Sequence, residues 1–94
     1  MSPYARKVDA NHAAIRQALR RAGWYVRDQS RVGEGWPDLF LAKGGTVLLA
    51  EVKDGSKVPS AQRLTPMQAE LHVALGRAGV KVVVLRSVED AIQL

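Results

Sequence analysis

The sequence predicts a single α/β domain in which a mixed central sheet is flanked by helices. Helical periodicity occurs in two well-separated segments, and short apolar runs typical of strands lie between and after them. A Gly-Gly pair joins two of these runs in the manner of a tight hairpin. The implied element order is α-β-β-β-α-β with a short final helix, as in layered α/β domains. A length of 94 residues allows one core, so residues 1–94 form one predicted domain.

The first predicted helix covers about residues 10–22, with Asp9 or Asn11 as its N-cap. Arg16 and Arg20 fall on one side of this helix, which is therefore basic. The opposite side is an apolar stripe with the i, i+3, i+4, i+7 spacing of a buried helix face. The stripe comprises Ala14, Ile15, Ala18, Leu19 and Ala22.

Three strands are predicted next, and the second and third of them form a hairpin. The first strand covers residues 23–26, the second 38–42 and the third 47–53. Residues 43–46 read Lys-Gly-Gly-Thr, and the two glycines supply the positive φ values that a tight hairpin turn demands. The second and third strands are therefore expected to be antiparallel neighbours.

The last third of the chain is predicted to contain a loop, a helix, a strand and a short helix. Residues 54–63 form an exposed polar loop, and Thr65-Pro66 marks a helix start with a hydroxyl cap before a proline. Residues 80–85 are almost wholly β-branched and are the strongest candidate for a buried strand. Residues 88–93 form the final helix. The longer helix has an apolar stripe of Met67, Leu71, Ala74, Leu75 and Ala78.

Charge and composition favour a polyanionic partner such as DNA. The net charge is +5, and the first 31 residues hold seven basic and two acidic residues. A solvated basic helix is the alternative explanation. The chain has no cysteine and no apolar run of the roughly 18 residues that a membrane span needs. Residues 1–8, predicted to be a flexible arm, precede no apolar signal segment, which indicates a cytoplasmic protein.

Three ionisable side chains close the predicted hairpin. Antiparallel pairing brings Asp38, at the start of one strand, beside Glu51, near the end of the other. Glu51 and Lys53 are two residues apart and project from one face of their strand. Neighbouring carboxylates repel unless a cation lies between them, and Mg²⁺ or Mn²⁺ prefers such oxygen ligands. A metal polarises a phosphate, and a lysine stabilises developing charge, so the set suits phosphodiester hydrolysis.

The same residues carry a resemblance to a nuclease superfamily. Pro37-Asp38, twelve intervening residues and Glu51-Val52-Lys53 resemble the PD-(D/E)xK motif, and the element order is similar to its restriction-endonuclease-like core. A closer resemblance is to the virus-type replication-repair nuclease (VRR-Nuc) domain in its small stand-alone form. It covers about residues 9–93 and rests on Gly35-Trp36-Pro37-Asp38-Leu39, Glu51-Val52-Lys53 and Gln68.

This resemblance implies roles for individual residues. Asp38 and Glu51 are expected to bind the metal through their side chains, and Val52 through its backbone carbonyl. Lys53 corresponds to the catalytic lysine, and Gln68 to a glutamine near the active site. The family members that this chain resembles are similar to Holliday-junction resolvases, which implies a homodimer in a bacterial cell or a phage-infected host.

One position departs from the family pattern. Where the first helix usually carries a glutamate that reaches the metal, this chain has Asn11, whose amide is expected to act through a water molecule. Asp9 is the alternative at this position. The loss of a charged ligand leaves open whether one or two metal ions bind. Predicted phosphate contacts are Arg16, Arg20, Lys57 and Arg63.

The sequence thus predicts a Mg²⁺-dependent endodeoxyribonuclease (or one that uses Mn²⁺) that acts on branched DNA such as four-way junctions. The alternatives within the class are a general repair nuclease and a restriction-like nuclease. A non-catalytic DNA-binding module that keeps the fold is a further alternative, as is a protein–protein adaptor with a basic helix. His12 and His72 are interpreted as helix-surface residues without a catalytic role.

Overall fold

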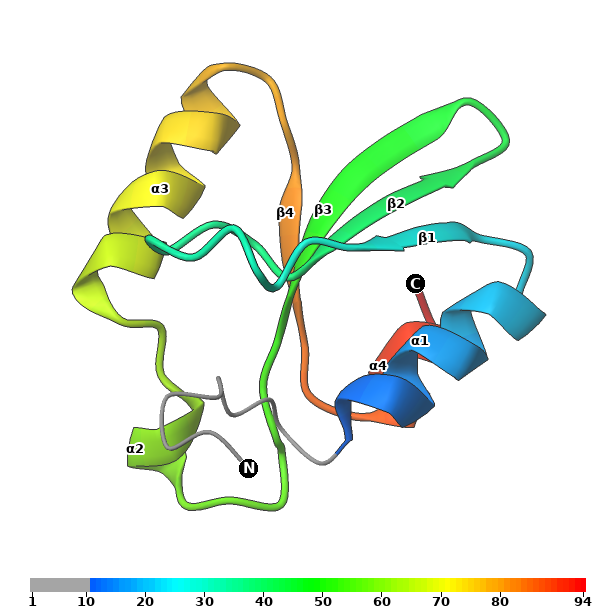
Figure 1. The fold of residues 1–94 in the computed structure, drawn as a ribbon, viewed down its shortest axis with the longest axis horizontal. Helices are drawn as coiled ribbons and strands as arrows, with labels where there is room; N and C mark the ends of the chain where they lie inside the picture. The colour runs from blue at the N-terminus through cyan, green and yellow to red at the C-terminus, as the bar shows by residue number, and fades with distance from the viewer. Residues whose placement is uncertain (1–10) are drawn as a thin grey trace.

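The computed structural model describes residues 11–94, so the predicted arm, Asp9 and the first residue of the predicted helix lie outside the described residues. Within residues 11–94 the elements follow the predicted order, with one short helix added. Figure 1 shows their arrangement. They are α1 (His12–Arg21), β1 (Tyr25–Asp28), β2 (Leu39–Lys43), β3 (Thr46–Val52), α2 (Pro59–Gln62), α3 (Pro66–Arg77), β4 (Val82–Leu85) and α4 (Val88–Ile92).

The four strands form one mixed sheet in the order β1-β2-β3-β4. The pairs β1–β2 and β2–β3 are antiparallel, whereas β3 and β4 are parallel. Leu39 lies opposite Ala50 in the β2–β3 pair. Continuing this register by one residue places Asp38 opposite Glu51. The predicted hairpin is therefore confirmed, and with it the mixed character of the sheet.

The hairpin turn has the predicted two-glycine form. Lys43 pairs with Thr46, which leaves Gly44 and Gly45 as the two loop residues. Their φ angles are 54° and 84°, and a turn that needs positive φ at both central positions is most easily made by glycine. The turn fixes the register of β2 against β3, and so the positions at which the strands end.

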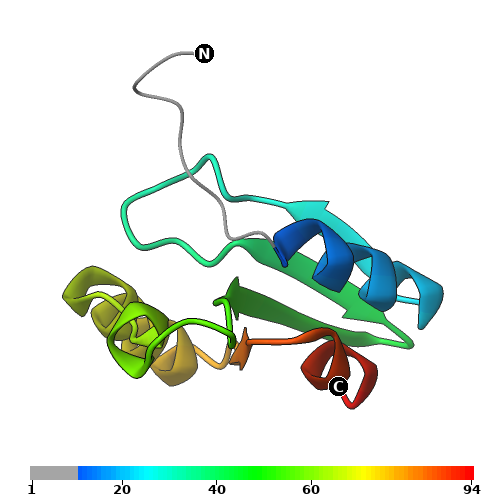
Figure 2. The ribbon, with the colours of Figure 1, turned by 90° about the horizontal axis from the view of Figure 1, so that it is seen from below.

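The core lies between the sheet and the pair α1 and α4. These two helices lie side by side next to the same face of the sheet, as Figure 2 shows. Ile15 and Leu19 of α1 are fully buried, as are Leu39 and Leu41 of β2. Burial of each such side chain contributes about 1.5–3 kcal/mol relative to exposure. The remaining buried members of the cluster are Trp24, Val26, Leu48, Ala50, Val52, Leu85 and Ala91.

Helix α3 lies on the other side of the sheet (Figure 1), and its predicted apolar stripe is only partly covered. None of its residues is fully buried. Leu71 and Leu75 of the predicted stripe are half-buried, whereas Met67, Ala74 and Ala78 are exposed. Its main strand contacts are with β4, at the sheet edge, so neighbours cover only one part of the stripe.

The prediction that residues 80–85 form a buried strand is wrong. β4 begins at Val82, and only Leu85 is buried. β4 is an edge strand, so a single neighbouring strand covers it despite its apolar composition. The first strand was predicted over 23–26 but extends from Tyr25 to Asp28, because an edge strand tolerates exposed charged residues.

The loop predicted over residues 54–63 contains the four-residue helix α2. A segment this short has no apolar periodicity, so only the proline at its first helical position could have indicated it. No helix within residues 11–94 has the length and apolar character that crossing a bilayer requires.

Candidate active site

The side chain of Asp38 is fixed at the start of β2. Its carboxylate accepts a hydrogen bond from the backbone N–H of Val52, with a distance of 2.8 Å between Oδ2 and N. The side chain is largely shielded, with 8% of Asp38 exposed. The preceding Pro37 is fully buried and fixes the direction from which the chain enters the strand. The Asp38 side chain thus links the start of β2 to Val52, the residue between Glu51 and Lys53.

Glu51 is a buried carboxylate on the α3 side of the sheet. Only 1% of the residue is exposed, although burying a charge is costly unless it has polar partners. The neighbouring Ala50 and Val52 belong to the core on the opposite face, so alternation directs Glu51 towards α3. There its Oε1 atom lies 3.3 Å from Nε2 of His72.

Lys53 projects from the same face and contacts the first turn of α3. Its Nζ atom donates to Oε1 of Gln68 at 2.9 Å. The same oxygen accepts the backbone N–H of Thr65 at 2.9 Å, and the Gln68 N–H donates to the Thr65 hydroxyl at 3.1 Å. These reciprocal bonds form a capping box, which fixes the orientation of the Gln68 amide. Gln68 therefore lies beside Lys53, where the resemblance placed it.

His72 was predicted to be an ordinary helix-surface residue, and this prediction is wrong. Its side chain is 13% exposed and faces Glu51. Burial lowers the pKa of His72 below its ordinary value, and the positive charge of Lys53 lowers it further. His72 is one helical turn after Gln68, so the i, i+4 spacing that places both on one face was available in the sequence.

The donor atoms at the ends of β2 and β3 fit a hard cation. The N–H of Lys53 points towards β4, where it donates to the Leu85 carbonyl at 2.9 Å, whereas the N–H of Val52 points towards Asp38. The C=O of a strand residue points to the same edge as its N–H, so the Val52 carbonyl also lies on the Asp38 side. Two carboxylates and one carbonyl supply oxygen ligands of the type that Mg²⁺ or Mn²⁺ prefers.

Within residues 11–94 no group of three or more histidine, cysteine, aspartate or glutamate side chains is arranged to hold a metal ion. A Mg²⁺ ion held by Asp38, Glu51 and the Val52 carbonyl would have several coordination positions left for water or substrate. This is the usual situation for Mg²⁺, which retains several water ligands in proteins.

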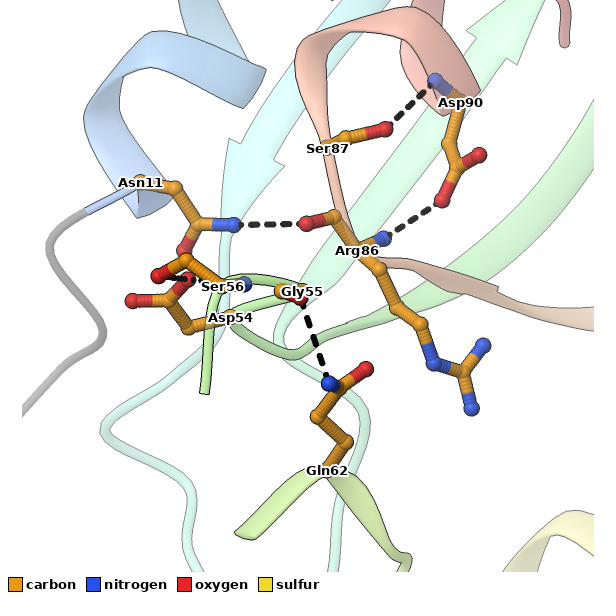
Figure 3. Close-up of a pocket in the computed structure, with 8 residues that line it drawn as sticks. All are labelled: Asn11, Asp54, Gly55, Ser56, Gln62, Arg86, Ser87 and Asp90. Carbon is orange, nitrogen blue, oxygen red and sulfur yellow. Dashed lines mark hydrogen bonds between the residues drawn. The ribbon is translucent and has the colours of Figure 1, made fainter. Parts of the chain in front are cut away.

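Asn11 occupies a different position from the two carboxylates. It is the residue before α1, and its Nδ2 atom donates to the carbonyls of Lys53 at 2.9 Å and Arg86 at 3.1 Å. Figure 3 shows its hydrogen bond to the Arg86 carbonyl, at a pocket that both residues line. Its Oδ1 atom is buried and has no hydrogen-bond partner within residues 11–94. Its predicted contact with the metal through water stays a prediction. The pocket is lined by Asn11, Asp54, Gly55, Ser56, Gln62, Arg86, Ser87 and Asp90.

Arg16, one of the four predicted phosphate contacts, is already paired within the protein. Its guanidinium forms an ion pair with Asp28 and lies 3.0 Å from Nδ1 of His12. Burial acts to raise the pKa of Asp28, but hydrogen bonds from Ser30 and the neighbouring positive charges lower it overall. His12 is 3% exposed, so its interpretation as a helix-surface residue is wrong.

The other predicted phosphate contacts are all at the surface. Arg20 is on α1, and Lys57 and Arg63 flank α2. Arg20 makes one long hydrogen bond to the Val26 carbonyl, at 3.4 Å. Lys57 and Arg63 follow the end of β3 closely, on the loop that leaves Lys53. Contact of these residues with phosphate stays a prediction.

The loop between β1 and β2 packs against the start of α3 through Gly35 (Figure 1). This glycine has a φ of +79°, and a Cβ atom built on it would lie 2.8 Å from Cγ and 2.9 Å from the backbone carbon of Met67. The contact joins the segment that leads to Asp38 to the helix that carries Gln68. The two halves of the site are thus held together outside the sheet.

Replacing Gly35 with alanine is expected to destabilise the fold more than the same change at Gly33. Gly33 also has a positive φ, of +74°, but a Cβ there meets nothing within 4 Å. The Gly33→Ala variant should therefore lose only the cost of the backbone conformation, about 1–2 kcal/mol. Gly35→Ala should lose about 1–3 kcal/mol more because the methyl group overlaps α3. Urea unfolding measures both values, and equal losses would contradict the proposed packing.

Comparison with known proteins supports the architecture. No family model matches the sequence, and no curated protein matches it. A solved structure described as "VRR_NUC domain" is similar, with a TM-score of 0.67 and 25% sequence identity over 92% of this chain and 95% of the other. The chain therefore has the VRR-Nuc fold, and the predicted restriction-endonuclease-like α/β core with a mixed sheet is confirmed.

Proposed function

We propose, from the VRR-Nuc fold shared with its structural neighbour, that this chain is a metal-dependent nuclease that hydrolyses DNA phosphodiester bonds. The observation that carries the proposal is the convergence of Asp38, Glu51 and Lys53 at one end of the β2–β3 hairpin. Two of these residues are largely buried charges, and each of the three has a polar contact that fixes it. A purely structural role gives no reason to bury two carboxylates at neighbouring strand ends.

Each residue has a distinct task in this proposal. Asp38, Glu51 and the Val52 carbonyl hold a Mg²⁺ or Mn²⁺ ion, which when bound polarises the scissile phosphate and facilitates deprotonation of water. Lys53 has one of its three Nζ donors on Gln68, and the others are available for a phosphate oxygen or an attacking water. Gln68 directs the ammonium group because its own orientation is fixed by Thr65.

For the substrate we propose branched DNA, cut by a homodimer. One chain of 94 residues carries one such site, whereas a four-way junction has a two-fold arrangement of strands. A two-fold dimer supplies a matched pair of sites. The positive net charge of +5 supports attraction of DNA, and Lys57 and Arg63 are expected to contact its phosphates next to the site.

Cleavage of four-way junction, splayed-arm and linear duplex DNA, each with Mg²⁺, Mn²⁺ or EDTA, tests this function. Junction cleavage that requires the metal is the expected result. Equal cutting of linear duplex would exclude the preference for branches but not the nuclease activity. Binding of DNA without cleavage by either metal would instead indicate a non-catalytic module. Sedimentation velocity at micromolar concentration should show a dimer, and a monomer alone would contradict the paired-site arrangement.

A further inference from the structure

We propose that His72 is a positioning residue that holds the Glu51 carboxylate in its metal-binding orientation. This inference rests on the proposed function, because Glu51 is a metal ligand only within it. His72 lies on α3, whereas Glu51 lies on β3, so the contact joins two elements that are 21 residues apart in sequence. The imidazole therefore contacts the Glu51 carboxylate from a helix outside the sheet.

The chemistry of a metal-binding carboxylate gives the direction of the hydrogen bond. Nε2 of His72 lies 3.3 Å from Oε1 of Glu51, and the two side chains are 13% and 2% exposed. Glu51 binds a metal as an ionised carboxylate, which only accepts hydrogen bonds, so in the proposed arrangement Nε2 carries the proton. The bond occupies Oε1 and fixes the rotation of the carboxylate group.

A second contact, between Lys53 at the end of β3 and Gln68 of α3, parallels the contact between Glu51 and His72. Gln68 and His72 are four residues apart on α3 and lie on one helix face. Glu51 and Lys53 are two residues apart on β3 and lie on one strand face. Gln68 binds Lys53 and His72 binds Glu51, so each functional side chain of β3 has its own partner on α3.

The two contacts also give a role to a helix that contributes little to the core. No residue of α3 is fully buried. Two of its polar side chains, Gln68 and His72, face the sheet and contact Lys53 and Glu51. Hydrogen-bond partners of metal-binding carboxylates typically change metal affinity by about 10–100-fold when removed. The same order of effect is expected for His72.

Two substitutions separate the hydrogen bond from the packing of the side chain. His72→Leu keeps an apolar side chain of similar volume but removes the donor, and His72→Gln keeps an N–H donor at similar reach. Val73→Ala is the matched control, because Val73 is the next residue of α3 and is 53% exposed. Thermal unfolding without metal shows whether all three variants fold.

Calorimetric titration with Mn²⁺ alone gives the decisive measurement, and junction cleavage at saturating metal is the second. His72→Leu should weaken Mn²⁺ binding by about 10-fold or more, whereas His72→Gln and Val73→Ala should stay within about 3-fold of the wild type. Equal Mn²⁺ affinity in the wild type and His72→Leu would overturn this inference but not the proposed function. A wild-type protein that neither binds Mn²⁺ nor cleaves DNA would overturn the proposed function, and this inference with it.

Discussion

Replacing Lys53 with alanine is expected to reduce single-turnover cleavage by about 10²–10³-fold, while metal affinity stays close to that of the wild type. The ammonium group is not among the oxygen donors at the strand ends, so removing it should leave metal binding intact. In the proposed mechanism it contributes to the transition state, in which negative charge develops on the phosphate. Quench-flow or gel assays on a preferred DNA substrate, with Mn²⁺ calorimetry on the same protein, measure the two quantities.

Lys81→Ala is the matched control for this change. Lys81 is exposed and directly precedes β4. It lies at one end of the β3–β4 pair and Lys53 lies at the other, so the Lys81→Ala substitution removes the same charge at a distance from the site. Its cleavage rate should remain within a few-fold of the wild type. Undiminished cleavage by Lys53→Ala would remove this lysine from the mechanism.

Replacing Glu51 with glutamine is expected to abolish stabilisation of the fold by Mg²⁺ or Mn²⁺. A ligand that binds only the folded state stabilises it by about 2.7 kcal/mol at a concentration of 100 times Kd. The amide keeps the size of the side chain and an acceptor for His72 but loses the negative charge that attracts the cation. Cleavage should fall together with the metal-dependent shift in melting temperature.

Thermal unfolding at several metal concentrations checks this expectation. Glu89→Gln removes one exposed carboxylate from α4, away from the site, and should retain the full metal-dependent shift. If Glu51→Gln were stabilised by Mg²⁺ as strongly as the wild type, Glu51 would not be a metal ligand.

Much of this site was predictable because local turn chemistry determines a long-range register. The Gly44-Gly45 pair selects a two-residue turn, and a two-residue turn leaves one way to align β2 with β3. The position of Asp38 opposite Glu51 follows from that alignment. The capping signal of Thr65-Pro66 likewise gave the start of α3, and so the place of Gln68.

Burial at the edge of the sheet was not predictable in the same way. Val82, Val83 and Val84 are as apolar as a central strand, but composition does not say which strand lacks a second neighbour. The contact of His72 with Glu51 was missed for a related reason. Its face of α3 was predictable, whereas the pairing of that face with Glu51 depends on how the helix docks.

Lys53 is held from both sides of the sheet, and this has a thermodynamic consequence. Its carbonyl accepts a hydrogen bond from Asn11, and its ammonium group donates one to Gln68. A lysine side chain loses about 1.5–2 kcal/mol of conformational entropy when it is immobilised. The hydrogen bond to Gln68 means that part of that loss occurs on folding. In the proposed mechanism, less of the binding energy of the DNA would then be needed to order the ammonium group for the reaction.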